Sequence, residues 1–475
     1  MARVILLMCV TVVAQHGSVA GAQSADVAPP EIAAVRAASP AGVSVDRTLT
    51  PGLADYEREA LAHNPTLRER QLAIARAEQE VSAARAGYLP RVELSARYTR
   101  LLFGGLDLGT LINPAYAALN HVSGTAQFPT DVSLHLPLAF DAKIELRQPV
   151  FAPALWVATR LAELGYSASQ VELAMAAREI TSGVRSAYLA HARAAQVATL
   201  LEQSRALLEE NLRVSQRLVG TDKQTADVVF RAQAELAGHD QLILQVAEAQ
   251  RAAARAVNLL RGAPGDAAVQ APRELPEPHA MPGPIGGYLD RAQRARAELQ
   301  LIAVERGVAA EQRALVRTGF LPTVAVVLAY GFQSDNLSPG FDDDYAAASV
   351  VMSWSLFDGR SDAHRSRARQ LDVVASDLRR RRMLDQIETE VRDAYGAAEL
   401  AMRAVVAIEA RVSSAQAAYD LVVKRYAVGG VAQIELIAAR TALLQARTDR
   451  ITAVTDYYAR LVELDRLTES TGVSR

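Results

Sequence analysis

Cysteine, aromatic residues and net charge are all scarce in this sequence. One cysteine, Cys9, occurs in 475 residues, and aromatic residues make up 5% of the chain. Without a second cysteine, the chain forms no internal disulfide bond and no multi-thiolate metal site. The formal net charge is −2, so no strong field attracts nucleic acid or a polyanionic surface. We therefore expect no nucleic-acid partner.

Motifs of enzymes are also missing. The sequence contains no His-Glu-x-x-His, no Gly-x4-Gly-Lys-Ser/Thr and no Gly-x-Ser-x-Gly segment, which are signatures of zinc hydrolases, P-loop proteins and serine hydrolases. The eight histidines are scattered. We predict that the protein is not an enzyme, has no catalytic or metal-binding residues and needs no cofactor.

The first 22 residues are typical of a secretory signal peptide. Arg3 precedes the apolar stretch Val4–Val13, and Ala20-Gly21-Ala22 provides a small-x-small cleavage site. The apolar stretch is too short to span a bilayer. Cys9 lies inside that stretch, so lipid attachment is not expected. We predict an exported protein whose mature chain begins with a flexible segment at residues 23–51.

Proline is absent from residues 154–263 and 340–475. Since proline inside a helix costs about 3 kcal/mol, both stretches permit long helices. Each is interrupted once by a turn signal, Val219-Gly220-Thr221-Asp222 in the first and Val428-Gly429-Gly430 in the second. The pattern predicts helical hairpins with arms of roughly 100 Å, which suit a coiled coil or tunnel wall. Their bounds are about 153–261 and 360–470.

Alternating residues precede each hairpin. In Arg91–Thr99 every second residue is apolar and the residues between them are polar, and Lys143–Phe151 has the same pattern. A period of two indicates strands between an apolar and a wet environment. Lengths of about 9–11 residues suit tilted membrane-spanning strands. We predict four strands, at about 91–102, 142–151, 322–333 and 346–357.

The two halves of the chain repeat each other. Gly87-Tyr88-Leu89-Pro90 matches Gly319-Phe320-Leu321-Pro322 at an offset of 232, and Val184–Tyr188 matches Val391–Tyr395 at an offset of 207. The smaller offset places an inserted loop, Arg100–Ala142, in the first half. We predict a first repeat at 52–262, a proline-rich linker at 263–286 and a second repeat at 287–472.

Four strands cannot close a barrel, and lipid cannot satisfy open strand edges. The strands must therefore be completed by other copies of the chain. The strands therefore require an oligomer, and a trimer is preferred because three copies give twelve strands, an even number within the usual range. The predicted fold is mainly α, with duplicated helix-strand-strand-hairpin units, a trimeric 12-stranded transmembrane β-barrel and a long helical tunnel.

With these features in order, the sequence resembles the TolC family of outer-membrane efflux proteins over about Leu53–Gly472. The matching motifs occur in the family's order, and some are duplicated. They are Asn64-Pro65-Thr66-Leu67, the two Gly-aromatic-Leu-Pro segments, Trp354-Ser355-Leu356-Phe357-Asp358-Gly359, Arg425-Tyr426 through Gly429, Glu435-Leu436 and Gly220 through Asp227-Val228.

The resemblance implies a homotrimer in the outer membrane, with its barrel in lipid and its helical tunnel in the periplasm. It also implies two partners, a periplasmic membrane-fusion adaptor and an inner-membrane pump. The pump is of the resistance-nodulation-division, ABC or major-facilitator type. The chain would be the passive exit duct of a tripartite efflux or type I secretion system.

The resemblance further implies a gate near the hairpin turns. The matching positions are Asp227, Tyr426 and Glu435. Repeated carboxylates around a threefold axis would favour cations; alternatively, both acids serve only as first-turn residues that stabilise the helix dipole. Val431 stands where family members carry arginine and Ala438 where they carry a second acid, so a family-type salt-bridge lock is in doubt here.

Two further groups are candidates by position. Gly220, Gly429 and Gly430 would form exposed turns that dock an adaptor, or would serve chain geometry alone. Tyr98, Tyr330, Trp354 and Phe357 would anchor the barrel at the membrane interface, or would pack at the junction of barrel and tunnel.

A periplasmic coiled-coil scaffold or membrane-fusion adaptor is the alternative. Such an adaptor usually has one helical hairpin inserted between β-rich halves. This chain has two predicted hairpins, each preceded by two alternating strands, which favours the channel.

Overall fold

A computed structural model describes most of the chain after residue 51. The described residues are 52–100, 106–132, 135–136, 140–222, 225–272, 274–279, 281, 283–334, 344–428 and 430–468. The predicted signal peptide, the segment 23–51 and Gly429 lie outside this part. None of the described helices combines the length and apolarity needed to cross a membrane.

The first repeat contains two short helices, two long strands and a helical hairpin. Its main elements are α2 (Leu53–His63), α3 (Pro65–Ala86), β1 (Arg91–Tyr98), β4 (Phe140–Phe151), α5 (Pro153–Gly220) and α6 (Asp227–Arg261). Asn64 separates the first two helices, because its side chain accepts hydrogen bonds from the Thr66 and Leu67 amides at the start of α3. Helix α5 has 68 residues, which corresponds to about 100 Å.

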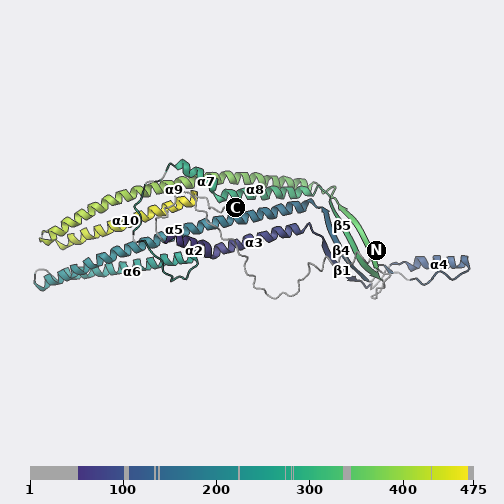
Figure 1. Cartoon of the computed structure of the whole chain (residues 1–475), viewed down its shortest axis with the longest axis horizontal. Helices are drawn as coiled ribbons and strands as arrows, with labels where there is room; N and C mark the ends of the chain where they lie inside the picture. Colours follow the sequence, from purple (N-terminus) through teal and green to yellow (C-terminus); the bar gives the residue numbers. More distant parts are fainter. Residues whose placement is uncertain are drawn as a thin grey trace. The chain divides into compact units, whose positions relative to one another are not determined.

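The second repeat has the same order of elements. They are α7 (Ile285–Ala295), α8 (Ala297–Thr318), β5 (Thr323–Ser334), β6 (Asp344–Ser353), α9 (Ser361–Ala427) and α10 (Gln433–Thr468). Helices α5 and α6 pack along each other, as do α9 and α10, and α5 also contacts α8 and α10 (Figure 1). The predicted mainly helical fold with four antiparallel strands is confirmed.

The duplication reaches the core. Tyr56 of α2 lies 6.0 Å from Tyr188 of α5, measured between ring centroids, and Tyr288 of α7 lies 5.5 Å from Tyr395 of α9. These pairs occupy matching positions of the two repeats. Ala60 and Ala292, which also match, are both fully buried. In each repeat, therefore, the same tyrosine pair packs a short helix against the hairpin.

The expectation of a loop at Arg100–Ala142 is wrong. Part of this segment forms helix α4 (Gly109–Ser123), and the short strands β2 (Leu106–Asp107) and β3 (His135–Leu136) pair at its base. Asn113 exchanges two hydrogen bonds with the Val132 backbone, at 2.8 and 2.9 Å. Asn120 does the same with Phe128. These side-chain bonds hold the returning chain against α4.

Two strands end earlier than predicted. Strand β1 stops at Tyr98 and β6 stops at Ser353. After β6, the Trp354 indole donates to the Phe320 carbonyl at 3.1 Å. The backbone then turns through Gly359 and Arg360, which both have a positive φ near 70°. This turn redirects the chain from the sheet into α9.

The proline-rich linker is attached to the helices that it crosses. The hydroxyls of Tyr457 and Tyr458 in α10 donate to the carbonyls of His279 and Pro276, at 2.5 and 3.1 Å. The buried His191 of α5 contacts the Val269 carbonyl at 3.1 Å. The described part of the linker thus runs along a fixed path.

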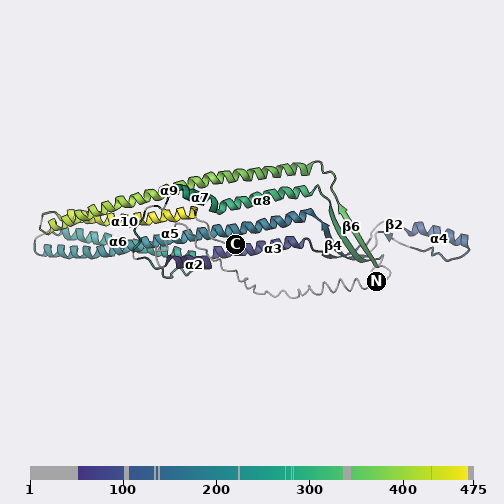
Figure 2. The ribbon, with the colours of Figure 1, turned by 45° about the horizontal axis from the view of Figure 1, so that its top comes forward.

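One sheet joins the two repeats. Its strand order is β1-β4-β5-β6, and all pairs are antiparallel (Figure 2). The central pair combines β4 from the first repeat with β5 from the second. Strands β1 and β6 are the two edges, so each has one side without a strand partner among the described residues.

A buried ionic cluster connects the start of α8 to α5 and α9. Arg296, just before α8, is 5% exposed and lies 2.7 Å from Glu390 and 3.3 Å from Glu298. Glu298 also pairs with Arg178 of α5 at 3.1 Å. In the first repeat, Asn64 takes the place of Arg296 and caps the helix. The second repeat therefore replaces a helix cap with ion pairs to α5 and α9.

The cluster predicts acid sensitivity. Burial raises the pKa of Glu298, but a backbone hydrogen bond and the nearby Arg178 and Arg296 lower it more, so its pKa lies below the ordinary value. A lowered pKa stabilises the folded state above the unfolded-state pKa, and the gain is lost as pH falls through the folded value. We expect the midpoint temperature of thermal unfolding of the detergent-solubilised protein to fall below about pH 4.3. This fall should be smaller in Glu298→Gln. An equal fall of the midpoint temperature at low pH in Glu298→Gln and the wild type would contradict the role of Glu298.

Candidate functional site

The sheet has one apolar face, and that face is exposed. The register aligns its side chains across all four strands. Leu94 is 75% exposed and Val350 is 73% exposed. The other exposed apolar members of this face are Val92, Tyr98, Ile144, Leu328 and Met352. An apolar surface of this extent is a contact surface for lipid or protein.

The opposite face of the sheet is polar in its first two strands. It carries the charged residues Arg91, Glu93, Arg97, Asp141, Lys143, Glu145 and Arg147. Strands β5 and β6 contribute small or uncharged residues to the same face. This two-faced pattern matches the lipid-facing and water-facing sides of a membrane strand.

Aromatic residues lie at both ends of the strands. Strand β4 begins with Phe140, beside Tyr98, and ends with Phe151. Its length of 12 residues corresponds to about 26 Å across a bilayer when strands tilt by about 45°. Membrane barrels have an apolar band of about 25 Å between aromatic girdles. The sheet therefore has the dimensions of a membrane-spanning wall.

The four predicted interface aromatics occupy different places. Tyr98 is exposed at the end of β1 away from the helices, while Trp354 and Phe357 are exposed where the chain leaves β6. Tyr330 lies within β5, and its hydroxyl donates to Asp344 at 3.0 Å. Their role as membrane anchors stays a prediction.

The first hairpin turn places Asp227 at the start of α6. Its carboxylate accepts a hydrogen bond from the Thr225 hydroxyl and lies 3.2 Å from Arg231. Gly220 is the last residue of α5 and has no positive φ, whereas Asp222 has a φ of 55°. The positive φ of this turn is therefore at Asp222, and the backbone conformation at position 220 does not require glycine.

The second hairpin turn places Tyr426 in the last turn of α9 and Glu435 in the first turn of α10. Tyr426 is half-buried and Glu435 is exposed. Gly430 donates its backbone N–H to the Arg425 carbonyl at 2.9 Å. Within the described chain, no hydrogen bond or ion pair joins Asp227 to Tyr426 or to Glu435. A single chain does not bring the predicted gate residues together.

Two other contacts join the hairpins near their turns. Gln433 of α10 donates to the buried Ser215 hydroxyl of α5 at 3.2 Å. Arg440 of α10 forms an ion pair with Glu235 of α6, and these side chains are only 12% and 21% exposed. Sequence analysis missed this inter-hairpin tie because its partners are far apart in the chain. Arg440 lies two positions after Ala438, where the resemblance implied a missing acid.

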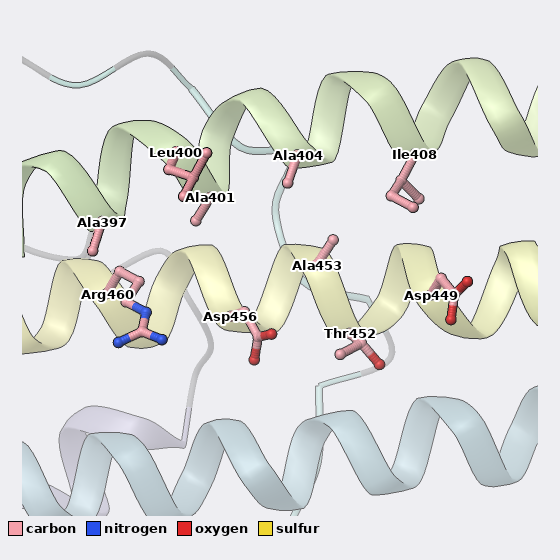
Figure 3. A pocket seen from close by; sticks show the side chains of 10 residues that line it. All are labelled: Ala397, Leu400, Ala401, Ala404, Ile408, Asp449, Thr452, Ala453, Asp456 and Arg460. Atoms are coloured by element: carbon pink, nitrogen blue, oxygen red, sulfur yellow. The ribbon is translucent and has the colours of Figure 1, made fainter.

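A groove of about 400 Å³ lies between α9 and α10 (Figure 3). Ala397, Ala401 and Ala404 of α9 face α10 across it. The acids on its rim are already paired, Asp449 with Arg411 at 2.7 Å and Asp456 with Arg193 at 3.8 Å. In the described part of the chain, no group of three or more metal-binding side chains occurs. The groove offers no set of convergent catalytic groups.

Comparison with protein families identifies the second repeat. Residues 288–469 match the family described as "Outer membrane efflux protein". The second repeat is an outer membrane efflux protein domain. This efflux domain contains α8, both strands of the second repeat and the hairpin of α9 and α10. No curated protein matches the chain.

Solved structures share the fold of the whole described chain. The outer membrane protein VceC from Vibrio cholerae is 18% identical, with a TM-score of 0.69, over 88% of this chain and 96% of that one. The CmeC outer membrane channel of Campylobacter jejuni is 14% identical, with a TM-score of 0.68, over 88% and 85%. The open-state MtrE channel of Neisseria gonorrhoeae is 16% identical, with a TM-score of 0.67, over 89% of each chain.

The efflux domain and the shared fold confirm the predicted resemblance. They favour an outer-membrane efflux channel, and they do not favour a periplasmic scaffold or adaptor. The family is one of channels and not of enzymes. Both comparisons are consistent with the predicted outer-membrane location.

Proposed function

We propose that this protein is the trimeric exit duct of a tripartite export system. The observation that carries the proposal is the four-stranded sheet. It has an exposed apolar face, a charged opposite face and two edges that no strand of the described residues covers. Lipid can cover the apolar face, but it cannot satisfy strand edges. A neighbouring copy can do so, by pairing its β6 with β1.

Three copies would complete a 12-stranded barrel, with the charged faces of β1 and β4 lining its interior. Helices α5, α6, α9 and α10 would form the tunnel wall below it. A duct of this kind guides cargo without chemical change.

The test is electron microscopy of the detergent-extracted mature protein. We expect threefold particles with a barrel embedded in detergent and a helical stalk of roughly 100 Å, from the length of α5. Monomers that stay soluble without detergent would contradict the channel and would support the scaffold instead.

The hairpin turns are the proposed site of partners and gating. A periplasmic adaptor would dock at the exposed turns near Gly220 and Gly430, and an inner-membrane pump would deliver cargo there. Asp227 and Glu435 would line the entrance after trimerisation, each repeated three times. The tie between Arg440 and Glu235 would hold the two hairpins of each chain together while the entrance is closed.

A charge on the apolar face is expected to prevent stable insertion. Leu94→Arg would place a cation against lipid in the middle of β1, at a cost of about 2–4 kcal/mol per chain. We expect most of this variant to be lost from the outer-membrane fraction. Ser95→Arg is the matched control, because its side chain faces the polar side. Equal recovery of both variants would contradict the assigned faces.

A further inference from the structure

Two arginines lie opposite each other on the polar face of the sheet. The register pairs Arg91 of β1 with Arg147 of β4. Like charges directly opposite each other destabilise a strand pair. The same row continues with Val327 of β5 and Ser349 of β6, so neither of these strands supplies a compensating acid.

The other charges on this face are neutralised in pairs. Arg91 lies 2.6 Å from Glu93, and Lys143 lies 2.9 Å from Glu145. Arg97 pairs with Asp141 at 3.2 Å. All three acids of the face are therefore engaged with a cation.

Arg147 is the cation that remains. Its side chain is exposed, and no hydrogen bond or ion pair joins it to another residue of the described chain. Arg147 is therefore neither buried nor neutralised by a partner among the described residues. Each copy of the chain therefore carries one uncompensated positive charge on the polar face, close to the end of the sheet where the helices begin.

We propose that Arg147 forms a ring of positive charge inside the barrel that favours anionic cargo. The inference rests on the proposed trimeric channel, in which the polar faces of three sheets line one lumen. Three copies then place three Arg147 side chains at one level, each beside an Arg91. Rings of basic side chains select anions, because low-dielectric walls focus their field into the water of the pore.

The ring recognises charge and not shape. Besides Arg91, which is paired with Glu93, the row of Arg147 contains only a valine and a serine. The favoured cargo is thus a class of molecules, those that carry carboxylate, phosphate or sulfate groups. A cation would meet this ring as a barrier between the tunnel and the outer mouth.

The test is the reversal potential of the full-length trimer in planar bilayers under a potassium chloride gradient. We expect Arg147→Gln to lower the permeability ratio of chloride to potassium, and Arg147→Glu to lower it severalfold further. Arg147→Lys keeps the charge and should retain the wild-type ratio. Ser349→Lys adds a cation to the same row and should raise the ratio.

The outcomes separate the two proposals. Conducting trimers whose permeability ratio is the same in the wild type, Arg147→Glu and Ser349→Lys would overturn the charge ring and leave the channel intact. Wild-type protein that forms neither trimers nor conducting pores would overturn the channel itself. Size-exclusion chromatography of each variant in detergent confirms that it assembles as the wild type does, and Ser349→Lys tests the ring with Arg147 unaltered.

Discussion

Replacing Arg296 with alanine is expected to lower the free energy of unfolding by about 3–5 kcal/mol, the cost of breaking a buried ion pair. Glu390 would lose its partner at 2.7 Å and Glu298 its partner at 3.3 Å. Both carboxylates would remain partly buried with less compensation. The measurement is loss of helical circular dichroism on heating, at fixed protein and detergent concentrations.

Two variants separate ion pairing from helix capping at this position. Arg296→Asn restores the residue of the first repeat, so its side chain can cap α8 and recover about 1 kcal/mol, but Glu390 stays unpaired. Arg76→Ala is the surface control, since Arg76 and Glu80 are both exposed and such changes stay within about 0.5 kcal/mol. If Arg296→Asn were as stable as the wild type, the buried ion pairs would stabilise the fold no more than a helix cap does.

Replacing Arg440 with alanine is expected to open the periplasmic entrance. The change removes the ion pair between α10 and α6 in each copy of the proposed trimer and leaves Glu235 without this cation. Because the pair is largely buried, its loss weakens the contact between the hairpins more than the loss of a surface pair would. We expect single-channel conductance to rise severalfold in planar bilayers.

Arg411→Ala is the matched control for this gating variant. Arg411 also pairs with an acid, Asp449, at 2.7 Å, but that pair joins α9 to α10 within one hairpin. We expect its conductance to equal that of the wild type. A rise in Arg411→Ala without one in Arg440→Ala would mean that stiffness inside the hairpin, and not the inter-hairpin tie, holds the entrance closed.

The sequence predicted the elements whose signals are local. Proline-free stretches indicated the long helices, because proline in a helix interior is costly. Alternation in 91–99 predicted which residues of β1 share a face. The duplication could be read from repeated motifs, and the tyrosine pairs 56–188 and 288–395 show that matching positions make matching contacts.

Features that depend on contacts between distant residues were not predictable in this way. Helix α4 lies in an inserted segment that was expected to be a loop and that contains Pro114. The bonds of Asn113 and Asn120 that hold it become visible only in three dimensions. The tie from Arg440 to Glu235 spans both repeats. Arg296 was visible only as a mismatch to Asn64, and its buried partners gave the mismatch its meaning.

The pairing of β4 with β5 also sets the order in which the chain can assemble. The entire first hairpin, the linker, α7 and α8 lie between these two neighbouring strands. Contacts between such distant segments form late, because closing a long loop costs entropy. Strand β4 therefore has β1 as its sole partner during export until the second repeat arrives. Its open edge and apolar side chains favour aggregation in that interval, so we expect this to be the stage of biogenesis at which the chain is most prone to aggregate.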